Sequence, residues 1–395
     1  MKSILINSSG YPTPTDPFFA FVEQIAIALS NKGIKVTVIS PQSITKHWLR
    51  GNELHPKYRH YNGSENNYGI DVYQPYVLTL GGKLRKLNDF FFGIARNRTL
   101  AKLKEIPDVC YGHFWFSGLG IYPYAKKHNL PLFIACGESN VLSENPYKPS
   151  SIKEFLQYVK GVICVSSKNK EESIEAGFTD GKNCVVIPNA VNSTLFRKKD
   201  RNELRLKYGY NENDFIVAYC GAFEHRKGSK RLSHAIDSLT DCDIKSFFIG
   251  KGLDYVLEEP DCKGILFKGP LGHEELPDYL NMADVFCLPT LREGCCNAIV
   301  EALACGLPVV SSDRSFNYDI LNDTNSIMVD PLSEKEIAAA LRLLYNNKEK
   351  RELLAAGALK SAENLTIDER AKRVICFIEE SVNGTIKYEN CDSDE

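Results

Sequence analysis

Two carboxylates separated by eight positions, Glu293 and Glu301, are the residues of this chain best suited to chemistry. A Gly-Cys-Cys-Asn run between them can open a helix, and apolar runs at 285–288 and 308–310 flank the pair. The pattern predicts strand, loop, helix and strand, with Glu293 on the loop and Glu301 on the helix. A helix N-terminus offers unpaired N–H groups and a positive dipole end to an anion, whereas carboxylates accept hydrogen bonds from hydroxyl groups. Together they indicate a ligand that is anionic at one end and hydroxyl-rich at the other, as a nucleotide sugar is.

Two cations lie in a loop that directly follows the apolar strand predicted at 215–220. The loop begins at Gly221 and contains Arg226 and Lys227. A pyrophosphate is bound by fixed cations and by close backbone approach; arginine can bind its oxygens through paired hydrogen bonds, and lysine supplies a point charge. Such a pair can also be solvated surface charge, but its place after a strand of the domain that contains Glu293 favours phosphate binding.

Composition indicates a globular protein of two ordinary domains. The chain has 395 residues, of which 43% are hydrophobic and 25% are charged, as in soluble proteins. The net charge of −2 gives no general attraction to nucleic acid, so no nucleic-acid partner is expected. No apolar run suits a signal peptide or reaches the ~20 residues that span a bilayer, so a cytoplasmic location is expected. The 13 cysteines are scattered without a C-x-x-C pair, which predicts reduced core residues and no structural zinc.

Short apolar runs alternate with helical patterns along the whole chain. A first helix is predicted at 18–31, where apolar residues recur at helical spacing. Two series of buried strands are predicted at 3–7, 35–40, 70–74, 108–111, 131–135 and 161–165, and at 215–220, 245–249, 264–267, 285–288, 308–311 and 326–329. Such alternation predicts an α/β protein with two doubly wound domains.

The change to highly charged sequence after Asn192 marks the predicted domain boundary. The first domain is then 1–192 and the second is 193–365, followed by a helix at 366–384. The polar and acidic tail at 387–395 is expected to be disordered.

The stretch from Val285 to Asp313 resembles the donor-site signature of retaining glycosyltransferases of the GT-B fold, family 4, called the E-x7-E motif. The loop that begins at Gly221 resembles the family's G-x-x-x-x-x-K-G loop, and Ile249 to Gly252 resembles its I-G-x-G turn. The resemblance covers nearly the whole chain. It implies two Rossmann-like domains that face each other across a cleft, with the acceptor side on the first, the nucleotide-sugar donor on the second and the last helix packed back on the first.

The resemblance also assigns roles to the donor-side residues. It implies that Glu293 holds the donor sugar's hydroxyls, whereas Arg226 and Lys227 stabilise the leaving diphosphate, where charge grows in the transition state. Glu301 is expected to bind the ribose. The other donor-binding residues are expected to be Gly10, Gly221, Gly250, Leu271, Gly294, Cys295, Cys296 and Asn297.

Polar residues after two strands of the first domain are expected on the acceptor side. They are His113, Glu138 and Ser139. Many members of the family have a His-Gly pair where this chain has Cys136 and Gly137. The contacts of that histidine then fall either to Glu138 and Ser139 or to His113, and the sequence leaves both alternatives open.

The activity implied is that of a retaining hexosyltransferase in cell-surface polysaccharide synthesis. It would move a sugar from a nucleoside-diphosphate donor, a UDP-sugar or alternatively a GDP-sugar, to a saccharide or lipid-linked acceptor, with no cofactor and no metal. Front-face attack by an acceptor hydroxyl is expected, with the β-phosphate taking the proton. The alternatives are another GT-B enzyme, such as a sugar-nucleotide epimerase or a phosphorylase, and a non-catalytic binding scaffold. The intact cations and glutamates argue against the scaffold, and Cys136 argues for it.

The segment 82–98 mixes five cations with leucine, phenylalanine and isoleucine residues. A basic amphipathic segment of this kind can lie on an anionic membrane, which here would mean peripheral contact with the inner face. The alternative is a helix packed on the first domain with a solvated basic face.

Overall fold

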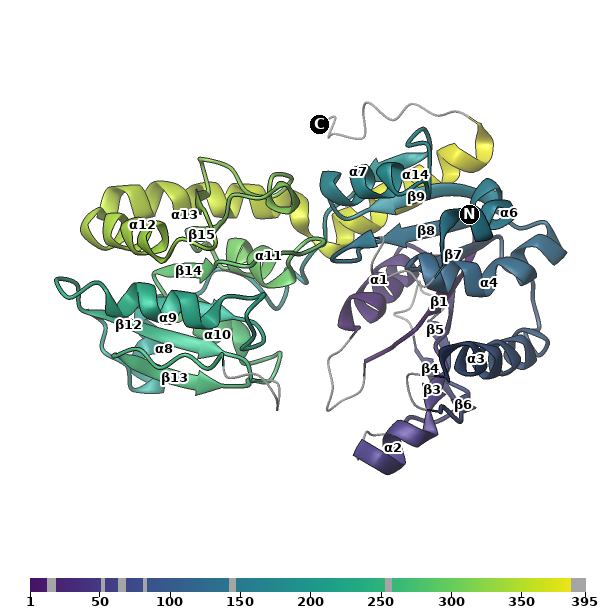
Figure 1. The fold of residues 1–395 in the computed structure, drawn as a ribbon, viewed down its shortest axis with the longest axis horizontal. Coiled ribbons are helices and arrows are strands. Elements are labelled where there is room, and N and C mark those ends of the chain that lie inside the picture. Colours follow the sequence, from purple (N-terminus) through teal and green to yellow (C-terminus); the bar gives the residue numbers. More distant parts are fainter. Residues whose placement is uncertain are drawn as a thin grey trace. The chain divides into compact units, whose positions relative to one another are not determined.

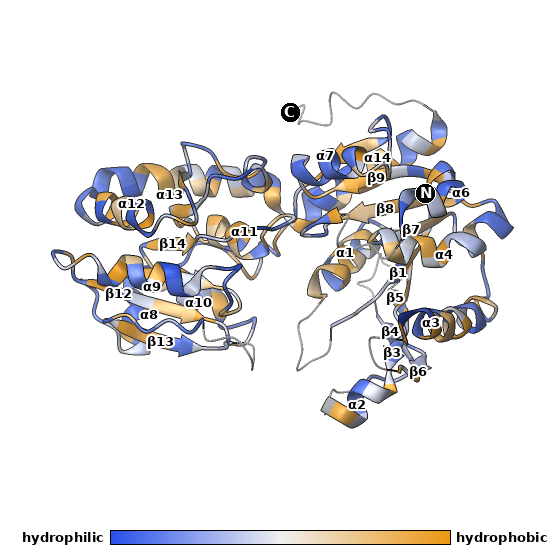
Figure 2. Ribbon diagram, in the orientation of Figure 1, coloured by the Kyte–Doolittle hydropathy of each residue, from blue (hydrophilic) through white to orange (hydrophobic). Residues whose placement is uncertain are grey.

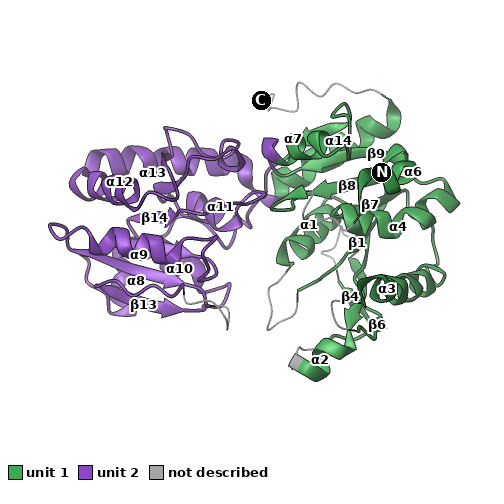
Figure 3. Cartoon of the chain, in the orientation of Figure 1, with its two compact units in different colours: residues 1–165, 169–187, 368–395 green, residues 166–168, 188–367 purple. Residues whose placement is uncertain are grey.

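The chain folds into two compact α/β units, each built on its own sheet (Figures 1 and 3). The computed structural model describes residues 1–12, 19–50, 54–62, 69–80, 84–141, 147–252 and 258–384. Unit 1 consists of Met1–Val165, Asn169–Ile187 and the segment from Asp368, and unit 2 consists of Ser166–Lys168 and Pro188–Ile367. The division thus falls slightly before the 192/193 boundary that the sequence suggests. The tail at 387–395 lies outside the described residues.

Unit 1 contains an eight-stranded sheet in the order β10-β9-β8-β7-β1-β2-β5-β4. Its strands are β1 (Ser3–Ser8), β2 (Lys35–Ile39), β4 (Tyr58–Tyr61), β5 (Ile70–Tyr73), β7 (Val109–His113), β8 (Leu132–Cys136), β9 (Val159–Cys164) and β10 (Cys184–Val186). Neighbours are parallel except β4 and β5, which pair antiparallel at the edge. β3 (Gln42–Ser43) and β6 (Tyr76–Val77) form a separate parallel pair. Central strands are apolar because helices cover both faces, as Figure 2 shows for β9.

The helices of unit 1 pack on this sheet through apolar stripes. They are α1 (Ala20–Asn31), α2 (Ile44–Arg50), α3 (Arg85–Leu100), α4 (Trp115–His128), α6 (Lys153–Tyr158), α7 (Ser167–Glu175) and α14 (Ile367–Asn383), with a 3₁₀ turn at Pro149–Ser151. In α1, the buried residues Ile25, Ala28 and Leu29 follow helical spacing. The terminal helix α14 contacts the sheet of unit 1, because the ring of Phe377 lies 6.0 Å from that of Phe133.

Unit 2 contains a six-stranded sheet that is parallel throughout, in the order β13-β12-β11-β14-β15-β16. Its strands are β11 (Phe215–Cys220), β12 (Ile244–Ile249), β13 (Ile265–Gly269), β14 (Val285–Leu288), β15 (Val309–Ser312) and β16 (Ser326–Val329). Its helices are α8 (Arg201–Tyr208), α9 (Ser229–Asp237), α10 (Leu276–Met282), α11 (Asn297–Ala304), α12 (Glu334–Asn346) and α13 (Lys348–Ala362), with 3₁₀ turns at Ser315–Asn317 and Glu363–Leu365.

Each sheet winds outward in both directions from one pair of central strands. In unit 1 this reversal lies between β1 and β7, and in unit 2 it lies between β11 and β14. Open α/β sheets bind ligands beyond the carboxyl ends of the strands at such a switch point. A binding site is therefore expected at the loops that follow these four strands.

The state of the cysteines and the character of the helices can be read from the structure. The twelve cysteines in the described residues are all free thiols, and most are buried. Within the part of the chain that the structure describes, no helix has the length and apolar character to cross a membrane.

Candidate active site

The ends of three neighbouring strands in unit 2 lie close together through glycines. The N–H of Gly221 donates to the carbonyl of Ile249 at 2.9 Å, and the N–H of Gly250 donates to that of Gly269 at 2.8 Å. Gly250 has φ 151°, and a Cβ there would lie 1.9 Å from the carbonyl oxygen of Gly221. Only glycine fits this position, which allows the carboxyl ends of β11 and β12 to approach this closely.

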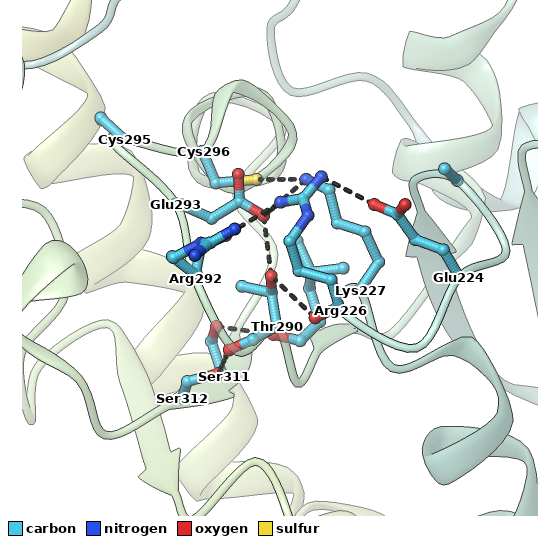
Figure 4. Close-up of polar contacts among 12 residues, drawn as sticks. Glu224, Arg226, Lys227, Thr290, Arg292, Glu293, Cys295, Cys296, Ser311 and Ser312 are labelled. Carbon is cyan, nitrogen blue, oxygen red and sulfur yellow. Dashed lines mark hydrogen bonds and ion pairs between the residues drawn. The ribbon is translucent and has the colours of Figure 1, made fainter. Parts of the chain in front are cut away.

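Three donors from two loops meet at one oxygen of Glu293 (Figure 4). Oε1 of Glu293 lies 2.9 Å from Nη1 of Arg226 and 2.7 Å from Nζ of Lys227. The hydroxyl of Thr290 donates to the same oxygen at 2.7 Å. Glu293 is only 8% exposed, and no described residue donates to its Oε2. The carboxylate is therefore fixed through one oxygen, and its other oxygen can accept a further hydrogen bond.

The charges of this cluster hold one another in the ionised state. Burial by itself would raise the pKa of Glu293, but the charges of Lys227 and Arg226 outweigh burial and lower it. For Lys227, burial would lower the pKa, whereas the neighbouring Cys296 and Glu293 raise it above its ordinary value. The site thus holds two cations, Arg226 and Lys227, against two carboxylates, because Glu224 also lies 2.7 Å from Arg226. The cations are fixed in place, and their N–H groups can bind the oxygens of a phosphate group.

Residues around the cluster fix the loop that carries it. Nη2 of Arg226 donates to Glu224 at 2.7 Å, and Nη1 donates to the carbonyl of Arg292 at 2.9 Å. The hydroxyl of Ser312 donates to the carbonyl of Thr290 at 2.5 Å. Sequence reasoning missed Glu224, Thr290 and Ser312, although all three stand at strand ends next to motif residues. Their position beside the motif was the only available signal.

The N-terminus of α11 lies beside the cations. Cys296 is its N-cap residue, and its Sγ is 4.0 Å from Nζ of Lys227. The amide of Asn189 donates to the carbonyl of Cys295 at 3.0 Å and to Oδ1 of Asn297 at 2.8 Å, and so holds this turn. Among the described residues, none accepts from the N–H groups of Cys296 and Asn297. These groups can therefore bind an anion. Asn189 was missed because it lies more than one hundred residues earlier in the chain.

Glu301 lies on α11, one turn after Asn297, and so shares a face of the helix with it. Burial raises the pKa of Glu301 to about 7. No residue in the described ranges donates a hydrogen bond to its carboxyl group. Of the other predicted donor residues, Gly294 is buried in the loop before α11, and Leu271 is half-buried just after β13 at the same edge of the sheet.

In unit 1, Gly10 and His113 lie at the switch point between β1 and β7. Ser8 and His113 are paired in register, so the loops after these strands are adjacent. His113 is buried, and the centre of its ring lies 5.1 Å from the centre of the Phe21 ring. Burial and the charge of Arg370 lower the pKa of His113 to about 3, so its imidazole is neutral. Its Nδ1 has no partner in the described structure.

Glu138 connects the loops after β7 and β8. Its Oε1 accepts from the N–H of Trp115 at 3.2 Å, at the start of α4, and its Oε2 accepts from that of Gly137 at 3.0 Å. Burial raises the pKa of Glu138 to about 7, against the effect of these backbone hydrogen bonds. Cys136 is fully buried with Sγ 3.4 Å from the hydroxyl of Ser173, so its thiol packs in the interior. Ser139 follows Glu138 in the same loop.

Two protein-family models match the chain. The model described as Glycosyltransferase Family 4 matches residues 20–195, and the model described as Glycosyl transferases group 1 matches residues 200–361. The first therefore falls almost wholly within unit 1, and the second falls within unit 2.

Curated relatives and solved structures are also glycosyltransferases or share the fold. The chain is 26% identical to the "Putative teichuronic acid biosynthesis glycosyltransferase TuaC" of Bacillus subtilis (strain 168), over 86% of this chain and 88% of the relative. It is 22% identical to N-acetyl-alpha-D-glucosaminyl L-malate synthase of Bacillus anthracis, over 67% and 68%. Its fold matches a sucrose-phosphate synthase from Thermosynechococcus elongatus with TM-score 0.77 and 16% identity, over 97% of this chain and 100% of the other.

A second solved structure, Anabaena HepE in complex with UDP and glucose, matches with TM-score 0.70 and 18% identity, over 96% of this chain and 99% of that one. The fold, the two family models and the strand–loop–helix that carries Glu293 and Glu301 thus lead to one conclusion. The chain belongs to the family 4 glycosyltransferases and has the GT-B fold, with two Rossmann-like domains.

Proposed function

We propose that this glycosyltransferase moves a sugar, with retention of configuration, from a nucleoside-diphosphate donor to a saccharide or lipid-linked acceptor. The observation that carries the proposal is the convergence of Arg226 and Lys227 on one oxygen of Glu293. This cluster lies beside the free N–H groups that begin α11. It places positive charge and an oriented carboxylate together, as a charged and hydroxyl-rich donor requires.

In this proposal the donor's diphosphate contacts Arg226, Lys227 and the N-terminus of α11. Oε2 of Glu293 accepts a hydrogen bond from a hydroxyl of the transferred sugar. Glu301, whose carboxyl group has no described donor, accepts from the ribose. Gly221 and Gly250 follow β11 and β12 at the carboxyl edge of the sheet, where the nucleotide is expected to bind.

The chemical step follows from the charges. As the bond between the anomeric carbon and the diphosphate breaks, negative charge grows on the leaving oxygen. Fixed cations and helix N–H groups stabilise that charge more in the transition state than in the ground state, which accelerates the step. The acceptor hydroxyl attacks from the face that the diphosphate leaves, the β-phosphate takes its proton, and the anomeric configuration is retained.

A UDP-sugar is the proposed donor, with a GDP-sugar as the alternative. Anabaena HepE, which shares the fold, was solved with UDP and with UDP-glucose. The Bacillus subtilis relative is named for teichuronic acid biosynthesis, which supports a polysaccharide of the cell surface as the product.

The test is release of nucleoside diphosphate from a panel of UDP-, GDP- and ADP-sugars, with NMR of the anomeric proton of the product. We expect diphosphate release that depends on an acceptor, and a product with the donor's anomeric configuration. Conversion of the donor to its epimer without acceptor would show an epimerase. Sugar 1-phosphate formation would show a phosphorylase. Binding of the donor without turnover, with every acceptor tried, would show a scaffold.

At pH 8, above the pKa of about 7, the Glu301 carboxyl is mostly ionised. Replacing it by glutamine should raise the donor KM at this pH by about tenfold, because a hydrogen bond to a charged acceptor is worth more than one to a neutral amide. The same change should alter the pH dependence of stability. The folded pKa of about 7 exceeds the ordinary value of 4.5, so the neutral carboxyl stabilises the fold at low pH and that stability is lost as pH rises through 7. Without ligand, the variant should therefore gain in Tm relative to wild type between pH 5 and pH 8.

An unchanged donor KM would contradict the ribose contact of Glu301. A Tm difference that stays constant between pH 5 and pH 8 would contradict the raised pKa of its carboxyl group.

Sugar transfer should continue in excess EDTA. Two cations and a helix N-terminus already face the expected position of the diphosphate, so the protein itself supplies positive charge to the leaving group. The measurement compares initial rates of diphosphate release before and after chelation. Loss of activity in EDTA that added manganese restores would show that a metal ion takes part.

A further inference from the structure

Large apolar side chains are exposed together on one part of unit 1. They lie on α2, on the segment after β6 and on α3, and they are Trp48, Leu49, Leu78, Leu80, Leu84, Leu87 and Phe90. Three are largely exposed: Trp48 by 68%, Leu49 by 79% and Phe90 by 60%. We call these seven residues, with the exposed cations Lys46, Arg85 and Lys86, the α2–α3 surface. A concentration of this kind is unusual on a monomer and indicates an interaction site.

Hydrogen bonds connect the parts of this surface. The N–H of Thr79 donates to the hydroxyl of Thr45 on α2 at 3.0 Å. The N–H of Leu80 donates to Oδ1 of Asn88 on α3 at 2.6 Å, and the amide of Asn88 donates back to the carbonyl of Leu80 at 2.6 Å. The segment between the helices is therefore attached to both, and α2 and α3 both contact β6 (Figure 1).

The exposed apolar residues of α3, together with its N-cap residue Leu84, lie on one side of the helix. Leu84, Leu87 and Phe90 recur every three positions, which places them along one side of the helix. The ring of Phe91 lies 5.9 Å from that of Phe90 and extends the apolar area. Figure 2 shows apolar and hydrophilic segments side by side along both α2 and α3.

The cations of the surface have no acidic partner among the described residues. Lys46, Arg85 and Lys86 are exposed, and within the described ranges no carboxylate lies at ion-pair distance from any of them. The guanidinium of Arg85 lies 5.7 Å from the centre of the Phe116 ring, a contact that leaves its charge in place. The surface thus combines aromatic and aliphatic side chains with unneutralised positive charge.

The structure corrects one part of the basic segment predicted at 82–98. Arg96 turns inward: a Cβ on Gly120 would lie 2.7 Å from its Nη1, and burial lowers the pKa of Arg96 to about 10. Lys83 lies outside the described residues. Of the predicted cations, Arg85 and Lys86 at the start of α3 are exposed on this surface. Lys46 adds a third exposed cation from α2, a helix that the sequence did not single out.

We propose that the α2–α3 surface binds this glycosyltransferase to an anionic lipid bilayer. Tryptophan and phenylalanine suit the boundary between headgroups and acyl chains, and the cations are attracted to anionic headgroups. Two copies of the same basic surface would bring like charges together, which disfavours self-association through it. The inference rests on the proposed function in one respect: a lipid-linked acceptor would lie in the membrane that the surface binds.

Co-sedimentation of the full chain with vesicles tests the proposal. Vesicles of phosphatidylglycerol and phosphatidylcholine would be compared with phosphatidylcholine alone, at low and high salt. Wild type should bind the anionic vesicles in a salt-sensitive way. The variants Trp48→Ser/Phe90→Ser and Lys46→Ser/Arg85→Ser/Lys86→Ser should each bind about tenfold or more weaker. Leu206→Ser/Leu353→Ser, which removes two exposed leucines from unit 2, is the matched control and should bind like wild type.

The remaining outcomes separate the proposal from its alternatives. Equal sedimentation of wild type and both surface variants would overturn it. So would a dimer of wild type in lipid-free light scattering that is absent from the surface variants, because the surface would then be a protein interface. Nucleoside-diphosphate release from the donor panel is measured on the same preparations without vesicles, with soluble saccharides and with a detergent-solubilised lipid-linked saccharide as acceptors. Turnover without vesicle binding overturns the lipid surface and leaves the proposed function intact, and vesicle binding without turnover does the reverse.

Discussion

Replacement of Lys227 by alanine should lower kcat/KM for sugar transfer by about 10²–10³-fold, the typical loss when one fixed group that stabilises developing charge is removed. Nζ of Lys227 lies 2.7 Å from Glu293 and 4.0 Å from the thiol at the start of α11. It therefore stands between the two groups that we expect to contact the sugar and the diphosphate. Because its charge acts mostly on the leaving group, kcat should fall more than donor affinity.

The variant should still fold, since Glu293 keeps its contacts with Arg226 and Thr290. Lys335→Ala is the matched control: this lysine is an exposed cation of the same unit, on α12. Steady-state kinetics of diphosphate release would be measured for both variants, with Tm as a check of the fold. Equal rates for Lys227→Ala and the control would show that the lysine is only an ion-pair partner of Glu293.

The central strands could be predicted from the sequence because each is a short run of apolar residues. β11 occupies the predicted range 215–220, since a parallel strand buried on both faces is a continuous apolar run. β4 (Tyr58–Tyr61) was missed because its Tyr-Arg-His-Tyr sequence is polar and half-exposed at an antiparallel edge. β10 was missed because it is an edge strand of three residues. Edge strands are less buried, so they lack the continuous apolar run by which a buried strand is predicted.

The sequence predicts that the candidate residues of unit 2 follow strands, but it does not predict the contacts between them. Both loops follow apolar strands, so the sequence places Arg226 and Lys227 after one strand and Glu293 after another. Their meeting depends on β11 and β14 being neighbours, although two strands separate them in the chain. Strand order in a doubly wound sheet is set by packing across the whole unit, and no local spacing encodes it.

The contacts of Glu138 are also not encoded in the local sequence. Sequence reasoning expected it on the acceptor side because it is polar and follows a strand. In the structure its carboxylate accepts backbone hydrogen bonds from two loops and caps the start of α4. A capping carboxylate normally precedes its helix closely in sequence, but Glu138 lies 23 positions after Trp115, so no local signature exists.

Replacement of Glu293 by glutamine should lower kcat by about 10²-fold or more, because an oriented group that acts in the transition state is lost, and it should change the donor KM much less. Glutamine keeps the shape and an acceptor for Thr290, but it no longer neutralises Arg226 and Lys227. The unliganded variant should therefore be less stable, because both cations keep their places while one carboxylate charge is gone. Arg226 retains Glu224, at 2.7 Å, which limits the loss for that cation.

Measurements with the product nucleotide UDP separate the loss of the sugar contact, which lowers kcat, from the loss of charge balance, which lowers stability. In the variant one carboxylate, Glu224, faces the two cations. The diphosphate of UDP supplies negative charge that the variant has lost, so UDP should raise the Tm of Glu293→Gln by more than it raises that of wild type. Thr290→Val is the matched control, since it removes a hydrogen bond from the same oxygen without changing the charge. It should lower kcat less and leave the response to UDP unchanged. If UDP instead stabilised Glu293→Gln less than wild type, the carboxylate would be organising the diphosphate site itself, and its assignment to the sugar hydroxyls would fall.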